Sequence, residues 1–126
     1  MAELSAVNRT TLLRDPENVR AARRFVEKAL ADHALVDLLD LASLLTSELV
    51  TNAIVHADSR VELEVRTSQE RVHVEVTNWG EGVPKVLPLD PTTTGGRGMA
   101  LVSSLANDWG TFERDGSRIV WFELRS

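Results

Sequence analysis

The decapeptide SELVTNAIVH, residues 47–56, carries the most informative pattern in this chain. It places Glu48, Asn52 and His56 four residues apart in a strongly helical segment, so the three polar side chains share one stripe of a helix that drifts by about 40° per step. An adjacent stripe is apolar and consists of Leu45, Leu49 and Ala53. The pattern indicates a helix with one apolar face packed in the core and one polar face directed away from it. Such a polar face fits a binding site or an ordinary solvated surface.

Two glycine-rich segments downstream favour the binding site. They are VTNWGEGVP at residues 76–84 and TGGRGMA at residues 94–100. Glycine permits positive φ and lets the backbone approach a ligand closely. The second segment leads into an apolar stretch, residues 99–106, that is typical of a helix, and backbone N–H groups at a helix N-terminus favour phosphate. Each segment alone also fits a plain loop, whereas the order of all three motifs is specific.

That order resembles the ATP-binding domain shared by gyrase, heat-shock protein 90, histidine kinases and MutL (the GHKL superfamily). The nearest likeness is to the bacterial anti-sigma-factor serine kinases. ELVTNAIVHA at 48–57 looks like their N box, NWGEG at 78–82 like the first glycine box, and GRG at 96–98 like the second. The resemblance extends to DPENVRAAR at 15–23 and DGS at 115–117, and so covers nearly the whole chain. It implies an α+β two-layer sandwich, the Bergerat ATP-binding fold, as a single domain over residues 1–126.

The resemblance also implies roles for the N box. Glu48 is expected to be the catalytic base that takes a proton from the attacking hydroxyl, although a surface helix glutamate is the simpler alternative. Asn52 is expected to be the protein ligand of Mg²⁺, since magnesium prefers oxygen donors and keeps several waters. His56 either lies near the phosphates or caps the helix end, where a cation is favoured.

The glycine boxes receive nucleotide-binding roles in the same way. Gly80 and Gly82 are expected to fold the turn under the adenine, and Gly95, Gly96 and Gly98 to wrap the phosphates. Arg97 either reaches the γ-phosphate, faces a protein partner or is solvated. Ser117 stands where the family has a hydroxyl residue near the base, or is a plain hairpin serine. The three tryptophans, Trp79, Trp109 and Trp121, are expected to pack in the core or at its rim, and His33 and His73 to be structural or solvated.

One residue departs from the family pattern. The family normally has aspartate where this chain has Asn78, accepting a hydrogen bond from the exocyclic amine of adenine. An amide oxygen still accepts, but without charge assistance, and the loss is about 1 kcal/mol, or roughly fivefold in affinity. The amide can also rotate to donate, which weakens the expected selectivity for adenine.

Composition narrows the class of protein. The chain has 126 residues, 43% of them hydrophobic and 26% charged, as in one globular domain. A net charge of −5 and a pI of about 5.2 argue against nucleic acid and anionic membranes as direct partners. The absence of cysteine excludes disulfides and thiolate metal sites and fits the cytoplasm. The N-terminal MAEL lacks an apolar run, so we expect no signal peptide.

Hydrophobic periodicity predicts two or three helices on one face of a mostly antiparallel sheet. In the first half of the chain we expect an edge strand at about 5–13, a helix starting at Asp15-Pro16 with its apolar face over 19–30, and a helix over 36–56. Strands at 61–66 and 72–77 should follow, joined by a hairpin at 67–70. The rest should form a loop or lid at 83–95, a helix at 99–107, and a final hairpin of 109–113 and 118–124 around Asp115-Gly116.

Taken with the resemblance, the sequence predicts an ATP- and Mg²⁺-binding regulator similar to an anti-sigma-factor serine/threonine kinase. It would phosphorylate a small antagonist protein and bind a sigma factor or similar regulator, and the family's usual state makes a homodimer a reasonable expectation. A sensor histidine kinase fits less well, because no phosphoacceptor helix hairpin precedes the domain. The alternative is a non-catalytic protein-binding module with a weakened nucleotide site, which Asn78 favours and Glu48 and Asn52 oppose.

Overall fold

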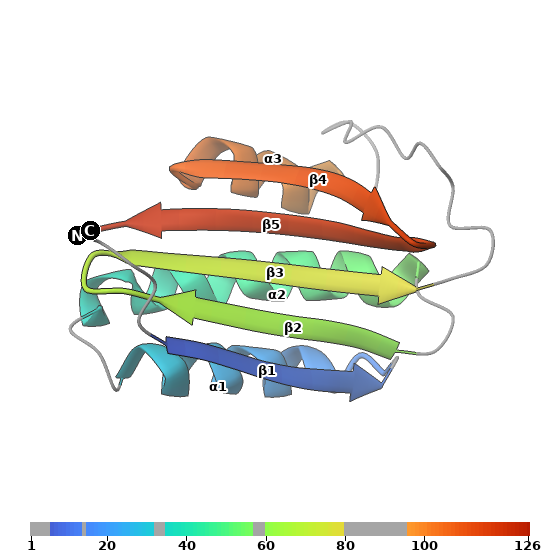
Figure 1. Cartoon of the computed structure of the whole chain (residues 1–126), viewed down its shortest axis with the longest axis horizontal. Coiled ribbons are helices and arrows are strands. Elements are labelled where there is room, and N and C mark those ends of the chain that lie inside the picture. Colours follow the sequence, from blue (N-terminus) through green and yellow to red (C-terminus); the bar gives the residue numbers. More distant parts are fainter. Residues whose placement is uncertain (1–5, 14, 32–34, 57–59, 80–95) are drawn as a thin grey trace.

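A five-stranded antiparallel sheet forms the frame of the molecule (Figure 1). The computed structural model describes residues 6–13, 15–31, 35–56, 60–79 and 96–126, and of His56 and Gly96–Gly98 it describes the backbone alone. The strands lie in the order β1-β2-β3-β5-β4, and every neighbouring pair is antiparallel. Their bounds are Ala6–Leu13 for β1, Arg60–Thr67 for β2, Arg71–Trp79 for β3, Asp108–Arg114 for β4 and Ser117–Arg125 for β5.

Three α-helices cover one face of this sheet (Figure 1). They are α1 (Asn18–Ala31), α2 (Leu39–His56) and α3 (Gly96–Leu105), and a short 3-10 helix, η1 (Val36–Leu38), precedes α2. The predicted α+β sandwich is therefore confirmed, and the predicted edge strand at about 5–13 forms as β1.

Helix starts differ from prediction by a few residues. The chain makes a turn after Asp15, whose carboxylate accepts a hydrogen bond from the Glu17 amide at 3.0 Å, so α1 begins at Asn18. The segment predicted as one helix over 36–56 opens with the tighter 3-10 turn, a common form of helix end. The third helix begins at Gly96 and not at residue 99, so the second glycine box is its first turn. The lid expected over 83–95 lies outside the described residues.

The hydrophobic core lies between the helices and the covered face of the sheet. Alternate residues of β3 point into it, because successive side chains of a strand face opposite ways. Val72, Val74 and Val76 are buried on this face, and their partners across the register with β5 include the fully buried Phe122. From α2, the predicted apolar stripe of Leu45, Leu49 and Ala53 packs into the same core.

The β4–β5 hairpin turns as the sequence predicts. Asp115 has φ of 50° and Gly116 has φ of 81°. A two-residue turn with positive φ at both central positions matches the twist of the flanking strands, and Asp-Gly is a preferred pair for it. This turn fixes the register that pairs Arg114 with Ser117.

One helical segment in the described part of the chain, Val36–Val55, is long and apolar enough to cross a membrane by length and composition alone. Half of it is buried inside the fold, against the sheet and α1, which is the pattern of a core helix. Packing in the core therefore explains why this helix is apolar.

Candidate functional site

The predicted site residues come from elements that meet at one end of the molecule (Figure 1). There α2 ends at His56, β3 ends at Trp79 and β5 begins at Ser117. Only two residues separate α3 from β4, so α3 runs antiparallel to β4 and its N-terminus lies at this same end. The fold thus gathers the N box, the first glycine box strand and the start of the second glycine box, which are far apart in the sequence.

Glu48 and Asn52 project from one side of α2, one helical turn apart. Both residues are half-buried, whereas their neighbours Leu49 and Ala53 are buried in the core. The pair therefore lies at the margin of the packed face, where a side chain can meet both the core and a ligand. The amide oxygen of Asn52 is a donor that Mg²⁺ accepts when nucleotide phosphates and water complete its coordination. Among the described residues no cluster of three His, Cys, Asp or Glu could hold a metal by itself, and this donor set fits a metal that arrives with its nucleotide.

Asn78 ends the row of β3 residues that face the helices. It is 4% exposed and continues the alternation of Val72, Val74 and Val76, so a polar side chain closes an otherwise apolar row. Its register partner on β5 is Arg118. Burial of an amide side chain at the edge of a core is costly unless its polar atoms are satisfied, so the apolar row of β3 ends on a group that requires polar partners.

Ser117 begins β5 beside the end of β3, but the register puts its side chain on the opposite face of the sheet from Asn78. Its register partner on β3 is Trp79, and its hydroxyl donates a 2.6 Å hydrogen bond to the backbone oxygen of Arg114. That bond tightens the β4–β5 turn, as expected of a hairpin serine. The register places Arg118, which belongs to none of the sequence motifs, beside Asn78 on the helix-covered face. The pairing of Arg118 with Asn78 can be recognised only from the register of the strands. That register depends on the position of the hairpin turn.

Several predicted residues lie outside the described residues or have only their backbone described. Gly80, Gly82 and Gly95 lie outside the described residues, and so does His33. The backbone of Gly96, Arg97 and Gly98 forms the first turn of α3, and His56 is the last residue of α2. The different roles expected of these residues therefore stay predictions.

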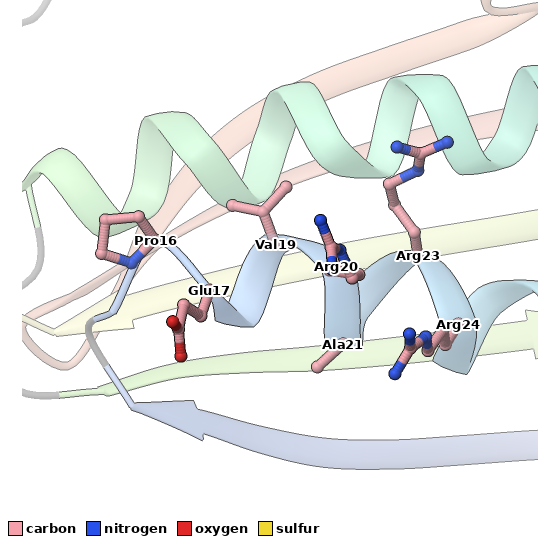
Figure 2. A pocket seen from close by; sticks show the side chains of 7 residues that line it. All are labelled: Pro16, Glu17, Val19, Arg20, Ala21, Arg23 and Arg24. Atoms are coloured by element: carbon pink, nitrogen blue, oxygen red, sulfur yellow. The ribbon is translucent and has the colours of Figure 1, made fainter.

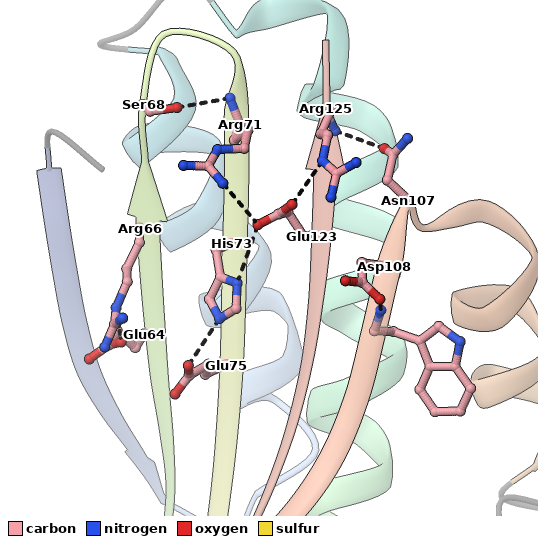
Figure 3. Close-up of polar contacts among 11 residues, drawn as sticks. Glu64, Arg66, Ser68, Arg71, His73, Glu75, Asn107, Asp108, Glu123 and Arg125 are labelled. Carbon is pink, nitrogen blue, oxygen red and sulfur yellow. Dashed lines mark hydrogen bonds and ion pairs between the residues drawn. The ribbon is translucent and has the colours of Figure 1, made fainter. Parts of the chain in front are cut away.

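The open face of the sheet carries a polar network that no sequence pattern indicates (Figure 3). His73 stacks on Trp121, and its Nε2 lies 2.9 Å from a carboxylate oxygen of Glu75. This hydrogen bond holds the pKa of the Glu75 carboxyl below its ordinary value, against the opposing effect of burial. Glu123, from the neighbouring strand, accepts a 2.9 Å hydrogen bond from Arg125. His73 is therefore structural, one of the two roles expected for it.

The three tryptophans also pack as expected, at the rim of the fold. Trp109 contacts the core on the helix side, and Trp79 lies under the guanidinium of Arg60, whose carbon is 4.4 Å from the ring centroid. Trp121 covers Gly110, where an added Cβ would come within 2.8 Å of the indole nitrogen. On the same open face Glu64 is buried between Arg9 and Arg66, which both bond to its carboxylate.

A surface cavity of about 700 Å³ lies at the start of α1 (Figure 2). Arg20, Arg23 and Arg24 line it, with Glu17 as the one acidic residue of its lining. Arg23 also reaches α2, where its Nε donates a 3.3 Å hydrogen bond to the Ser43 hydroxyl. Because α1 and α2 run antiparallel, the start of α1 lies beside the second half of α2 (Figure 1). The arginine cavity is thus at the same end of the molecule as Glu48 and Asn52.

The fold, a five-stranded antiparallel sheet covered on one face by three helices, is an α+β sandwich. Residues 12–123 match the family model described as histidine kinase-like ATPase domain, and the chain belongs to this family. The match takes in the three helices and β2, β3 and β4, together with the last two residues of β1 and all of β5 except Leu124 and Arg125. A comparison with curated proteins finds no match.

Proposed function

We propose that this protein binds Mg-ATP at the end of α2 and transfers the γ-phosphoryl group to a serine or threonine hydroxyl of a small partner protein, in the manner of anti-sigma-factor kinases. The observation that carries the proposal is the placement of Glu48 and Asn52, half-buried and one turn apart, at the end of the fold where Asn78 closes the core. Membership in an ATP-binding family supports the nucleotide.

In the proposed reaction the partner's hydroxyl oxygen forms a bond to the γ-phosphorus, the bond from that phosphorus to the β,γ-bridging oxygen breaks, and ADP leaves. Glu48 accepts the hydroxyl proton, because a carboxylate next to the nucleophile raises the electron density of the attacking oxygen. Asn52 would hold Mg²⁺, which neutralises charge on the phosphates when bound. The backbone N–H groups that open α3 favour the phosphates, since the first turn of a helix has unpaired donors.

The arginine cavity on α1 supports a protein substrate. Three arginines in one recess suit an acidic surface on the partner, with bidentate bonds to carboxylates. A partner bound there would lie beside α2, close to the proposed phosphoryl donor. We further propose that the protein acts in the cytoplasm, that the partner is an antagonist or sigma-type regulator, and that the working form is a homodimer.

The second candidate function is a binding module that holds the partner without phosphorylating it. Asn78 favours this alternative, because a neutral amide binds the adenine amine less tightly than a carboxylate does. Both candidates require the same fold and the same partner, and they differ in whether nucleotide binds and reacts.

Calorimetric titration with Mg-ATP, together with thermal melting, tests the proposal. A ligand that binds only the folded chain adds about 2.7 kcal/mol of stability at a hundredfold excess over Kd, which raises Tm by several degrees in a domain of this size. Millimolar Mg-ATP that changes neither heat nor Tm would refute the nucleotide site. Binding without phosphoryl transfer to a captured partner would select the non-catalytic module.

A further inference from the structure

The residue that faces Asn78 across the sheet is cationic, and this bears on which base the site accepts. Arg118 and Asn78 are register partners on β5 and β3, on the face that the helices cover. Residues directly opposite in an antiparallel pair have Cβ atoms about 4.5–5.5 Å apart, so one ligand atom can meet both side chains. The two residues are therefore neighbours on the helix-covered face at the end of β3.

Arg118 interrupts an apolar row. The residues that follow it on the same face of β5 are Val120, Phe122 and Leu124, of which the last two are fully buried. Arg118 itself is half-buried. Its register partner on the other side is Glu113 of β4, which is exposed. The row thus ends on a charged residue beside Asn78.

The hydrogen-bonding capacity of this pair differs from that of a carboxylate. Asn78 can accept a bond through its oxygen or donate one through its nitrogen after the amide rotates, whereas Arg118 can only donate. Adenine presents an amine at position 6 and an acceptor at N7. Guanine and hypoxanthine present a carbonyl at position 6 and the same acceptor at N7, a pair of acceptors that arginine binds in bidentate fashion.

We propose that Asn78 and Arg118 together form the base-recognition pair of the nucleotide site and that this site accepts 6-oxopurine nucleotides as well as ATP. Arg118 donates to N7 of either purine and to O6 where it is present. Asn78 accepts from the adenine amine or, rotated, donates to the carbonyl. This inference rests on the proposed nucleotide site and deepens it by naming the class of ligand.

Binding of Mg-ATP, Mg-GTP and Mg-ITP to the full chain, measured by calorimetry, tests the inference. ITP carries the 6-carbonyl without the 2-amino group of guanine, so it isolates recognition at position 6. We expect GTP and ITP to bind within about tenfold of ATP, because each purine satisfies both side chains. Mg-CTP serves as the comparison without a purine ring and is expected to bind more weakly than all three.

Variants assign the effect to the two residues. Asn78→Asp should strengthen the binding of ATP relative to that of GTP and ITP by about tenfold, since a carboxylate cannot donate to a carbonyl. Arg118→Met should weaken the binding of GTP and ITP about tenfold more than that of ATP, and Arg118→Lys should restore part of the lost affinity. Arg114→Met is the matched control, because Arg114 sits in the same hairpin but lies opposite Ser117, with its guanidinium over the Phe112 ring. Circular dichroism confirms that each variant is folded.

The outcomes separate the inference from the proposed function. If ATP binds while GTP and ITP bind more than about a hundredfold more weakly, the inference is overturned and the nucleotide site stands. If Arg118→Met changes the Kd of every nucleotide no more than Arg114→Met does, Arg118 does not contact the base and the inference is likewise overturned. If none of the purine nucleotides binds, the proposed function fails and the inference fails with it.

Discussion

His73 and Trp121 stack on the open face of the sheet, with ring centroids 5.2 Å apart and planes inclined by 21°. The stack holds the imidazole so that its Nε2 meets Glu75 at 2.9 Å. The same indole also covers Gly110. Three strands are therefore linked by a single packed layer on the face that the helices leave open, and two predictions concern that layer.

The first prediction is a loss of stability at acid pH through Glu75. Its pKa is lowered in the folded state, chiefly by the hydrogen bond from His73. A carboxyl whose folded pKa lies below its unfolded value, about 4.3, contributes stability that is full above that value and is lost as pH falls through the folded pKa. Glu75→Gln should therefore cost about 1 kcal/mol at pH 7 and make the free energy of unfolding less dependent on pH below about 4.3.

Urea denaturation at a series of pH values measures this effect. Glu70→Gln is the matched control, since Glu70 is an exposed glutamate in the turn that precedes the same strand. Equal pH dependence in the Glu75→Gln variant and the unmodified protein would show that the bond to His73 does not favour the ionised carboxylate.

The second prediction concerns Gly110. A Cβ added there would lie 2.8 Å from the Trp121 indole nitrogen and 3.0 Å from the nearest ring carbons. Gly110→Ala must therefore push the indole off its place and loosen the stack on His73, at a cost of about 1–3 kcal/mol in the free energy of unfolding. Thermal or urea unfolding gives the value.

A double-mutant cycle identifies the cause. Trp121→Ala removes the obstacle, and in that background Gly110→Ala should cost much less. Gly116→Ala is a useful contrast, because Gly116 has open space around it but a φ of 81°, so its cost of about 1 kcal/mol comes from the backbone. Costs for Gly110→Ala that are the same with and without Trp121 would point to the backbone at Gly110 as well.

The third prediction separates the roles of Glu48 and Asn52. Glu48→Gln keeps the shape of the side chain and removes the proton acceptor, so it should reduce phosphoryl transfer by at least about a hundredfold while leaving the Kd for Mg-ATP nearly unchanged. Asn52→Ala should weaken binding in the presence of Mg²⁺ and change binding in EDTA little. Calorimetry and a phosphorylation assay with the captured partner measure the two effects. Equal losses of nucleotide affinity in both variants would mean that Glu48 is a structural residue.

The fourth prediction concerns the arginine cavity. Arg20→Glu and Arg24→Glu reverse charge at exposed positions of its rim and should lower partner affinity at least about tenfold, with the effect shrinking as salt rises. Mg-ATP affinity should stay unchanged. Lys28→Glu, also exposed but in the last turn of α1, is the matched control. Loss of partner binding that is as large for Lys28→Glu would indicate a general charge effect and not a docking site.

Local sequence determined most of the architecture. The alternation in residues 72–77 indicates which side chains of β3 are buried, and Asp115-Gly116 indicates the turn in which both residues have positive φ. The four-residue spacing of Glu48 and Asn52 is enough to put them on one side of α2, whatever that helix packs against. These features depend on the period of a helix or strand and on the backbone freedom of a few residues, which neighbouring residues set.

Only the tertiary structure decided which residues lie opposite one another on neighbouring strands. The pairing of Asn78 with Arg118, and of Trp79 with Ser117, depends on the register between β3 and β5, which are separated by α3 and β4 in the chain. A shift of one residue would exchange the faces of all these side chains. The stack of Gly110, Trp121 and His73 likewise joins three strands that no local pattern connects. Periodicity fixes which face of its own element a residue occupies, whereas the neighbours on that face are fixed by packing of the whole sheet.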